Sequence, residues 1–284
     1  MAGTSFADVV ARGREQLVAA GIPEDQARLD AELLARHALG WDRAVWLASR
    51  RDEAPDPFLS EYAGLLARRL AREPVSLITG AREFWGLQFD TRPGVLIPRF
   101  ETELIVEEAL DQLARVEAPR IADIGTGSGC LAVALAHELP RARVVATDLS
   151  ALALDVARSN AKKHGVTDRV RFVLTDMLDG IGDSFDVIVS NPPYVQSGDR
   201  EGLAPEVRDH EPALALFGGT DGLDAIRAVV ARTPARLAPG GRLIIEFGYD
   251  QDERVCAIAQ NGGLTVLRIR DDLQGIPRVA VLTR

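Results

Sequence analysis

The first 75 residues place large apolar side chains at the spacing of amphipathic helices. One stripe spans two helices, the second with Pro23 in its first turn: Phe6, Val9, Val10, Leu17, Val18, Leu29, Leu33 and Leu34. A later stripe ends before Pro74: Leu59, Leu65, Leu66 and Leu70. Because residues at this spacing usually fill a core, the pattern predicts a small helical bundle over residues 1–75.

The spacing changes to alternation between Gly80 and Pro98. The residues concerned are Phe84, Trp85, Leu87 and Phe89, followed by Pro93-Gly94 and the apolar segment 95–97. Alternation bounded by turn residues is typical of paired strands. We therefore expect a β-hairpin linker over residues 76–100 that joins two domains.

Residues 101–284 repeat strand, turn and helix. The expected strands are 120–124, 142–147, 170–174, 185–190, 242–247, 264–269 and 278–283, and the expected helices after the first are 131–139, 151–164, 223–237 and 251–260. Such alternation predicts an α/β domain with a mostly parallel, seven-stranded, Rossmann-like sheet and helices on both faces. A short turn-like connection predicts that the last two strands pair antiparallel.

Composition excludes several classes of protein. Hydrophobic residues make up 46% of the chain and charged residues 26%, which are globular proportions. The longest apolar run, 130–136, is far shorter than the roughly 20 residues that cross a bilayer. Charged residues from Asp8 onward precede any apolar stretch, so we expect neither a secretory signal nor a membrane anchor. The expected location is the cytoplasm.

Net charge and the positions of potential metal ligands bear on nucleic-acid binding and on metal sites. The 33 basic and 42 acidic residues give a net charge of −9, and this field repels a polyanion, so we expect no direct nucleic-acid binding. The two cysteines and four histidines show no metal-ligand spacing. We therefore expect no metal site.

A glycine-rich loop follows the first strand of the second half, in Asp123-Ile-Gly-Thr-Gly-Ser-Gly129. Its three glycines let the backbone pass close to a ligand at a helix N-terminus. The loop also satisfies G-x-G-x-x-A, with Asp148 about twenty residues on, as in dinucleotide-binding folds. Asp148 can accept both hydrogen bonds of a ribose diol, whereas Ser150 is better placed to cap the next helix. These features favour a nucleoside-containing cofactor over an empty turn.

A second motif, Asn191-Pro-Pro-Tyr194, ends the fourth strand. Two prolines fix the backbone and remove two amide donors, leaving carbonyl groups that only accept. The Asn191 side-chain oxygen and the Pro192 carbonyl could then bind both N–H groups of a planar NH2 and aim its nitrogen at an electrophilic methyl group. Tyr194 offers a ring for stacking. A hydride-transfer enzyme has no evident use for these two acceptors.

Together the two motifs resemble those of amino-methyltransferases that use S-adenosylmethionine. That group includes adenine-N6 DNA methyltransferases and protein glutamine methyltransferases. Four further parts of the chain, 73–87, 95–103, 248–251 and 272–278, are similar to the release factor glutamine methyltransferase family, also known as PrmC or HemK. The resemblance spans almost the whole chain.

The resemblance implies a fold, a reaction and a set of roles. It implies a helical substrate-recognition domain over 1–75 and a class I S-adenosylmethionine-dependent methyltransferase domain over 101–284. The substrate would be the glutamine in the Gly-Gly-Gln motif of peptide-chain release factors. The methionine part of the cofactor would be cradled by Gly125, Thr126, Gly127, Ser128 and Gly129.

The remaining roles follow from the same resemblance. Asp148 would hold the ribose, and Asp176-Met177 would lie by the adenine. Asn191 would contact both cofactor and substrate, and Asn191, Pro192, Pro193 and Tyr194 would grip the glutamine, with Asn191, Pro192 and Tyr194 as the catalytic residues. Two residues depart from the family pattern. Phe100 stands where proline is more frequent, and Met177 where an aromatic residue is frequent, although its polarizable sulfur can pack on adenine.

Other interpretations remain open at this stage. A ribosomal-protein glutamine methyltransferase would share the chemistry, an adenine-N6 nucleic-acid methyltransferase is disfavoured by charge, and a nicotinamide-dependent oxidoreductase is disfavoured by the Asn191 motif. Asp123 and Glu246 lie at strand ends. Their carboxylates could orient the amino group of the cofactor, or they could cap neighbouring helices. For His210 and its acidic neighbours Glu206, Asp209 and Glu211 we expect a solvated loop rather than a general base.

Overall fold

The computed structural model describes residues 4–284. The chain divides into two compact units. One unit contains the chain up to Gly80 together with Pro205–His210, and the other contains Ala81–Ala204 and Glu211–Arg284. The segment 205–210, far away in sequence, thus belongs with the N-terminal helices.

The first unit is a bundle of helices, as predicted. Its helices are α1 (Phe6–Ala19), α2 (Glu24–Leu39), α3 (Arg43–Ser49), α4 (Asp56–Leu70), α5 (Val75–Thr79) and, from the distant segment, α9 (Pro205–His210). Ser5 and Asp8 form a capping box that begins α1. The Phe6 ring lies edge-on to Phe58 at a centroid distance of 4.8 Å, at the centre of the apolar core.

The buried face of α2 differs from the prediction. Leu29 and Leu33 are 52% and 42% exposed, so assigning them to the core was wrong. The buried residues are instead Ala27, Asp30, Ala31, Leu34 and Ala35. Small side chains let the neighbouring helices approach closely, and Asp30 is buried because its Oδ2 accepts from Nε of Arg69 at 2.7 Å.

The second unit is built on a seven-stranded sheet, which confirms the predicted fold class. The strands are β3 (Arg120–Ile124), β4 (Arg143–Asp148), β5 (Val170–Leu174), β6 (Phe185–Ser190), β7 (Leu237–Glu246), β8 (Thr265–Asp271) and β9 (Pro277–Thr283). They lie in the order β5-β4-β3-β6-β7-β9-β8. All neighbouring pairs are parallel except those of β9, which runs antiparallel to β7 and β8, as expected for the final pair.

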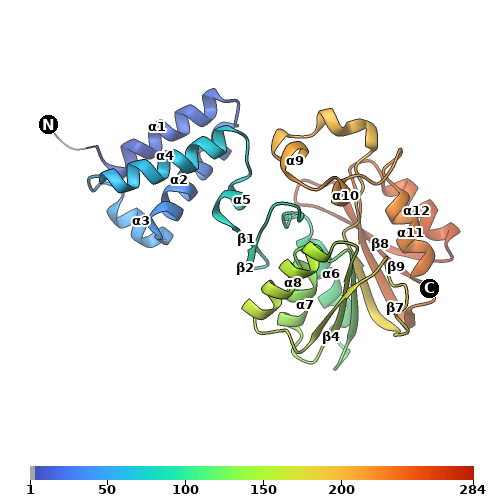
Figure 1. The fold of residues 1–284 in the computed structure, drawn as a ribbon. Helices are drawn as coiled ribbons and strands as arrows, with labels where there is room; N and C mark the ends of the chain where they lie inside the picture. The colour runs from blue at the N-terminus through green and yellow to red at the C-terminus, as the bar shows by residue number, and fades with distance from the viewer. Residues whose placement is uncertain (1–3) are drawn as a thin grey trace. The chain divides into compact units, whose positions relative to one another are not determined.

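Helices cover both faces of this sheet (Figure 1). One face carries α6 (Glu103–Leu113), α7 (Cys130–Glu138) and α8 (Ala151–Lys163), and the other carries α11 (Asp224–Arg232) and α12 (Asp252–Asn261). The long connection from β6 to α11 contains η1 (Ser197–Gly202), α9 and α10 (Ala213–Leu216). Two separate apolar cores result, one on each side of the sheet.

The hairpin is shorter than its sequence pattern suggested. It consists of β1 (Ala81–Phe84) and β2 (Leu87–Asp90), and residues 95–97 form no strand. Phe84 and Phe89 are fully buried in the core under α6 and α7. The hairpin therefore packs as part of the second unit.

Transmembrane helices are not found in the described part of the chain. Among residues 4–284 no helix combines the length and the apolar character needed to cross a membrane.

Candidate active site

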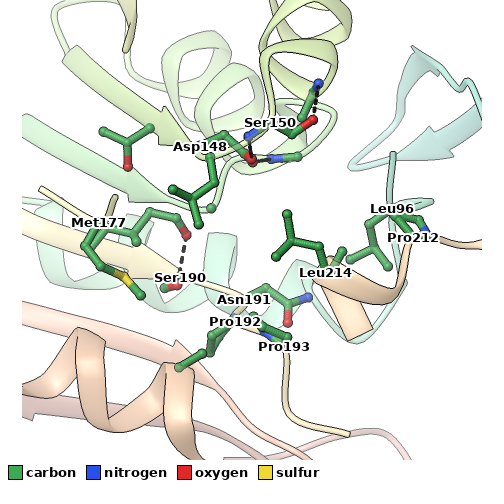
Figure 2. Close-up of a pocket in the computed structure, with 18 of the residues that line it drawn as sticks. Leu96, Asp148, Ser150, Met177, Ser190, Asn191, Pro192, Pro193, Pro212 and Leu214 are labelled. Carbon is green, nitrogen blue, oxygen red and sulfur yellow. Dashed lines mark hydrogen bonds between the residues drawn. The ribbon is translucent and has the colours of Figure 1, made fainter. Parts of the chain in front are cut away.

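A cavity opens where the strand order reverses. After β3 the chain adds β4 and β5 on one side and later β6 and β7 on the other, so the connections that leave the carboxyl ends of β3 and β6 run in opposite directions. Open α/β sheets bind ligands at this point. The cavity has a volume of about 400 Å³, within the usual range for small-molecule sites. Figure 2 shows Asp148 and Ser150 on one side of it and Asn191, Pro192 and Pro193 on another.

The glycine loop contributes to the cavity through two of its three glycines. Gly125 and Gly127 line it, have φ of 72° and 56°, and would meet no atom within 4 Å if they carried a Cβ. They leave space against which a ligand can lie close to the backbone. Gly129 does not line the cavity: a Cβ there would lie 2.9 Å from Cβ of Ala157. Its small size serves the packing of α7 against α8.

Thr126 and Ser128 also lie outside the cavity lining and are both buried. The hydroxyl of Thr126 donates to Oδ2 of Asp123 at 2.6 Å, and the same oxygen accepts from the N–H of Ala132 in the first turn of α7. The carbonyl of Ser128 accepts from Nδ2 of Asn160 at 2.9 Å. These residues hold the loop in shape, and Asp123 acts as a cap rather than as a lining residue.

Asp148 lines the cavity at the end of β4, as predicted. Its Oδ2 accepts from the N–H of Gly127 at 2.9 Å, and its Oδ1 accepts from the N–H of Ser150 at 2.8 Å. A carboxylate has about four lone-pair positions, so two stay available for a ligand. Ser150 is the N-cap of α8, because its Oγ accepts from the N–H of Ala153.

The Asn191 motif forms another wall of the cavity. Asn191, Pro192 and Pro193 all line it. Nδ2 of Asn191 donates to Oγ1 of Thr102 at 2.8 Å, and Thr102 lies outside the lining. The amide nitrogen therefore points away from the cavity, and Oδ1 is the part of the side chain left to accept from a ligand.

Tyr194 lies outside the cavity lining, unlike the rest of the motif. Its hydroxyl donates to Oε1 of Glu246 at 3.2 Å. Gln251 holds the same turn: Nε2 donates to the Tyr194 carbonyl at 3.0 Å, and Oε1 accepts from the N–H of Gly248 at 2.9 Å. Sequence reasoning assigned no role to Thr102 or Gln251, although both lie in segments that resemble the family.

Apolar side chains complete the cavity. Leu96, Leu214 and Met177 line it, with Leu214 on α10 of the long connection (Figure 2). Met177 has φ of 48° and so brings its side chain in from a tight turn after β5. Phe100 is outside the lining and 62% exposed, and the Arg82 guanidinium lies 4.3 Å above its ring.

Two buried carboxyl groups lie behind the cavity. Loss of hydration raises the pKa of Asp123 to about 7, against hydrogen bonds from Thr126 and Ala132 that lower it. Burial likewise raises the pKa of Glu246 to about 7, opposed by hydrogen bonds from Thr102 and Tyr194. Glu246 also lies outside the lining, so neither carboxylate contacts a ligand in the cavity directly.

The expectation of a solvated segment around His210 was wrong for two of its neighbours. Glu206, on α9, forms ion pairs with Arg69 and Arg72 of the helical unit. Glu211 is buried and pairs with Arg99 in the other unit. His210 does not line the cavity. Across residues 4–284, no three His, Cys, Asp or Glu side chains are grouped as metal ligands.

Comparison with known proteins matches both parts of the chain. The family model described as the PrmC N-terminal domain matches residues 8–80, and the model described as the methyltransferase small domain matches residues 100–206. The solved structure of a ribosomal protein L11 methylase from Lactobacillus delbrueckii subsp. bulgaricus aligns with a TM-score of 0.51 at 21% identity, covering 68% of this chain and 83% of that one. This likeness shows a shared fold.

Curated relatives are similar to this chain over most of their length. A release factor glutamine methyltransferase of Bradyrhizobium diazoefficiens is 45% identical, covering 89% of this chain and 87% of the relative. Another, from Geobacter sulfurreducens, is 46% identical, covering 90% and 89%. With a methyltransferase fold, a glycine-rich loop and the Asn191 motif at one cavity and this degree of identity, the chain belongs to the release factor glutamine methyltransferase family.

Proposed function

We propose that this enzyme transfers a methyl group from S-adenosylmethionine to the side-chain amide nitrogen of the glutamine in the Gly-Gly-Gln motif of peptide-chain release factors. The observation that carries the proposal is the orientation of Asn191 at the cavity, with Nδ2 bound to Thr102 and Oδ1 left to accept. The names of the relatives support the substrate.

The residues of the cavity fit S-adenosylmethionine. Gly125 and Gly127 leave open space beside the backbone, and Asp148 keeps two lone-pair positions, enough for a ribose diol. Met177 and the neighbouring Asp176 line the cavity where adenine would lie. A solved structure with the same fold, an rRNA methyltransferase of T. thermophilus with a TM-score of 0.50, is a complex with AdoMet. When bound, this cofactor supplies an electrophilic methyl group on a sulfonium.

The protein's part in the reaction is mainly to position the amide. The glutamine nitrogen is a weak nucleophile because its lone pair is delocalised. Oδ1 of Asn191 and the Pro192 carbonyl would accept its two N–H groups, which turns the nitrogen toward the methyl carbon. Held in this way, the nitrogen would form its bond to the methyl carbon as the carbon–sulfur bond breaks with its electron pair left on sulfur. The nitrogen would then be cationic and acidic, and it would release its proton to solvent.

We assign recognition of the release factor to the helical unit. The support is the match of residues 8–80 to the PrmC N-terminal domain. In addition, among the described residues 4–284, those that line the cavity belong to the other unit. The net charge of −9 favours a protein substrate over nucleic acid. For an enzyme with this substrate we propose a location in the cytoplasm.

A labelled-methyl assay tests the proposal. Enzyme and radiolabelled S-adenosylmethionine are incubated with a full-length release factor, with the same factor carrying alanine for the Gly-Gly-Gln glutamine, and with ribosomal proteins. Label is expected in the unmodified release factor alone. Equal labelling of the alanine-substituted factor, or labelling of the ribosomal proteins only, would contradict the proposed substrate.

A further inference from the structure

Thr102 occupies the N-cap position of α6 but does not cap it. Threonine at this position usually accepts a hydrogen bond from the first turn of its helix. Here no side-chain capping bond is formed. The hydroxyl, in a residue only 2% exposed, is directed instead at Glu246 and Asn191.

The hydroxyl of Thr102 has one proton, which fixes the direction of the hydrogen bonds. Oγ1 lies 2.8 Å from Oε2 of Glu246, and an ionised carboxylate only accepts, so Thr102 donates there. Oγ1 also lies 2.8 Å from the Asn191 amide, and with its proton already used it accepts in that bond. Only the NH2 end of an amide donates, and this requirement orients the Asn191 side chain.

An asparagine amide has nearly the same shape after a 180° rotation, so packing alone does not decide which end faces the cavity. A rotated Asn191 would present NH2 to the substrate NH2, two donors that cannot bond. The carboxylate that fixes Thr102 also accepts from the Tyr194 hydroxyl through its other oxygen. One buried group thus holds both polar ends of the Asn191–Tyr194 motif.

The geometry points to Thr102 and Glu246 as positioning residues that lock Asn191 with Oδ1 toward the glutamine amide. This inference rests on the proposed function and extends it by two residues that do not line the cavity. The three side chains form a chain of hydrogen bonds. Glu246 accepts the hydroxyl proton of Thr102, and Thr102 can then only accept from Asn191, which fixes the orientation of the Asn191 amide. A variant at Thr102 or Glu246 therefore changes catalysis without touching either ligand.

Substitutions at Thr102 separate this role from simple packing. Thr102→Val keeps the shape and removes the hydroxyl, while Thr102→Ser keeps the hydroxyl. Thr233→Val is the control, since Thr233 is also fully buried and its hydroxyl donates to the Val229 carbonyl of α11, at the C-terminal end of that helix. Turnover at saturating release factor and S-adenosylmethionine is expected to fall about 10-fold or more in Thr102→Val. Thr102→Ser should stay within about threefold of the wild type, and Thr233→Val should match it.

Substitutions at Glu246 test the same bond from its other end. Glu246→Gln can still accept from Thr102 through its amide oxygen, whereas Glu246→Met cannot accept. Turnover is expected to be clearly higher in Glu246→Gln than in Glu246→Met. The affinity for S-adenosylhomocysteine, measured by calorimetry, should stay within about twofold in every variant that melts cooperatively, so the defect lies in kcat and not in cofactor binding.

The outcomes separate this inference from the proposed function. If the wild-type enzyme does not methylate the release factor, the proposed function fails. If it does, but Thr102→Val turns over as fast as Thr102→Ser, the lock is refuted. Should Thr102→Val not fold, equal turnover of Glu246→Gln and Glu246→Met refutes it instead. A combined Thr102→Val/Glu246→Met variant no slower than the slower single variant would support it, because both changes break one chain of bonds.

Discussion

Replacing Asp148 with Asn perturbs the cofactor site at a single atom. The N–H groups of Gly127 and Ser150 use one lone-pair position on each carboxylate oxygen, at 2.9 and 2.8 Å. The two remaining positions are those assigned to the ribose diol. Asparagine keeps one oxygen and loses the charge. Its NH2 group replaces the other oxygen, so one ribose hydroxyl and one of the two backbone N–H groups lose a charge-assisted hydrogen bond. Bonds of this kind contribute about 1.5 to 3 kcal/mol, which corresponds to a roughly 10- to 100-fold weaker Kd.

Calorimetric titration with S-adenosylhomocysteine measures this change. The matched control is Asp155→Asn, the same substitution on α8 at a side chain that is 67% exposed and pairs with Arg158. We expect the control to bind within twofold of the wild type. An Asp148→Asn variant that also binds within twofold would show that this carboxylate does not hold the ribose.

Substitutions at three other residues have definite expected outcomes. Gly129→Ala should lower the free energy of unfolding by about 2 to 4 kcal/mol in urea titrations, because φ is 83° and the new Cβ would lie 2.9 Å from Ala157; an unchanged midpoint would contradict this. Burial raises the pKa of Glu246 from 4.5 to about 7. Between pH 5 and 8 the free energy of unfolding of the wild type should therefore fall by up to about 3 kcal/mol relative to that of Glu246→Gln. If the two proteins lose stability in parallel over this range, the shift is contradicted. Asn191→Ala should slow single-turnover transfer by about 100-fold or more, and wild-type rates in this variant would remove Asn191 from its assigned role.

The direction of the pH effect follows from proton binding. Glu246 holds a proton more tightly in the folded protein than in the unfolded chain. Folding therefore takes up a proton between the two pKa values, and the stability present at low pH is lost as the pH rises toward the folded pKa. The ionised form that orients Thr102 is thus the less stable one, so the lock is held at a cost in stability.

Much of the fold could be predicted because its strands are short apolar runs between turn residues. β3, β5 and β6 have the predicted bounds, and the antiparallel final pair follows from its short connection. The buried face of α2 could not be predicted. Alanines carry little apolar signal, and the partner that buries Asp30 is Arg69, which lies 39 residues away.

In the candidate site, too, some residues could be predicted from the sequence and others could not. Asp148 and Asn191 were placed from sequence, because strand ends in a parallel sheet meet at one edge. The role of Thr102 could not be placed, since its partners Asn191 and Glu246 lie 89 and 144 residues away and its local pattern indicates an ordinary helix cap. Gly129 lies in a sequence pattern typical of a ligand-binding loop. In the structure, however, its lack of a side chain makes room for Ala157 of the neighbouring helix.

The central claim is that the methyl group goes to one amide nitrogen of one glutamine. It is tested most directly by incubating a purified, unmethylated release factor with this enzyme and S-adenosylmethionine, and then measuring intact mass and locating the modification by tandem mass spectrometry. The account predicts the mass increase of a single methyl group, on the side chain of the Gly-Gly-Gln glutamine. An unmodified factor, or a methyl group on any other residue, would contradict it.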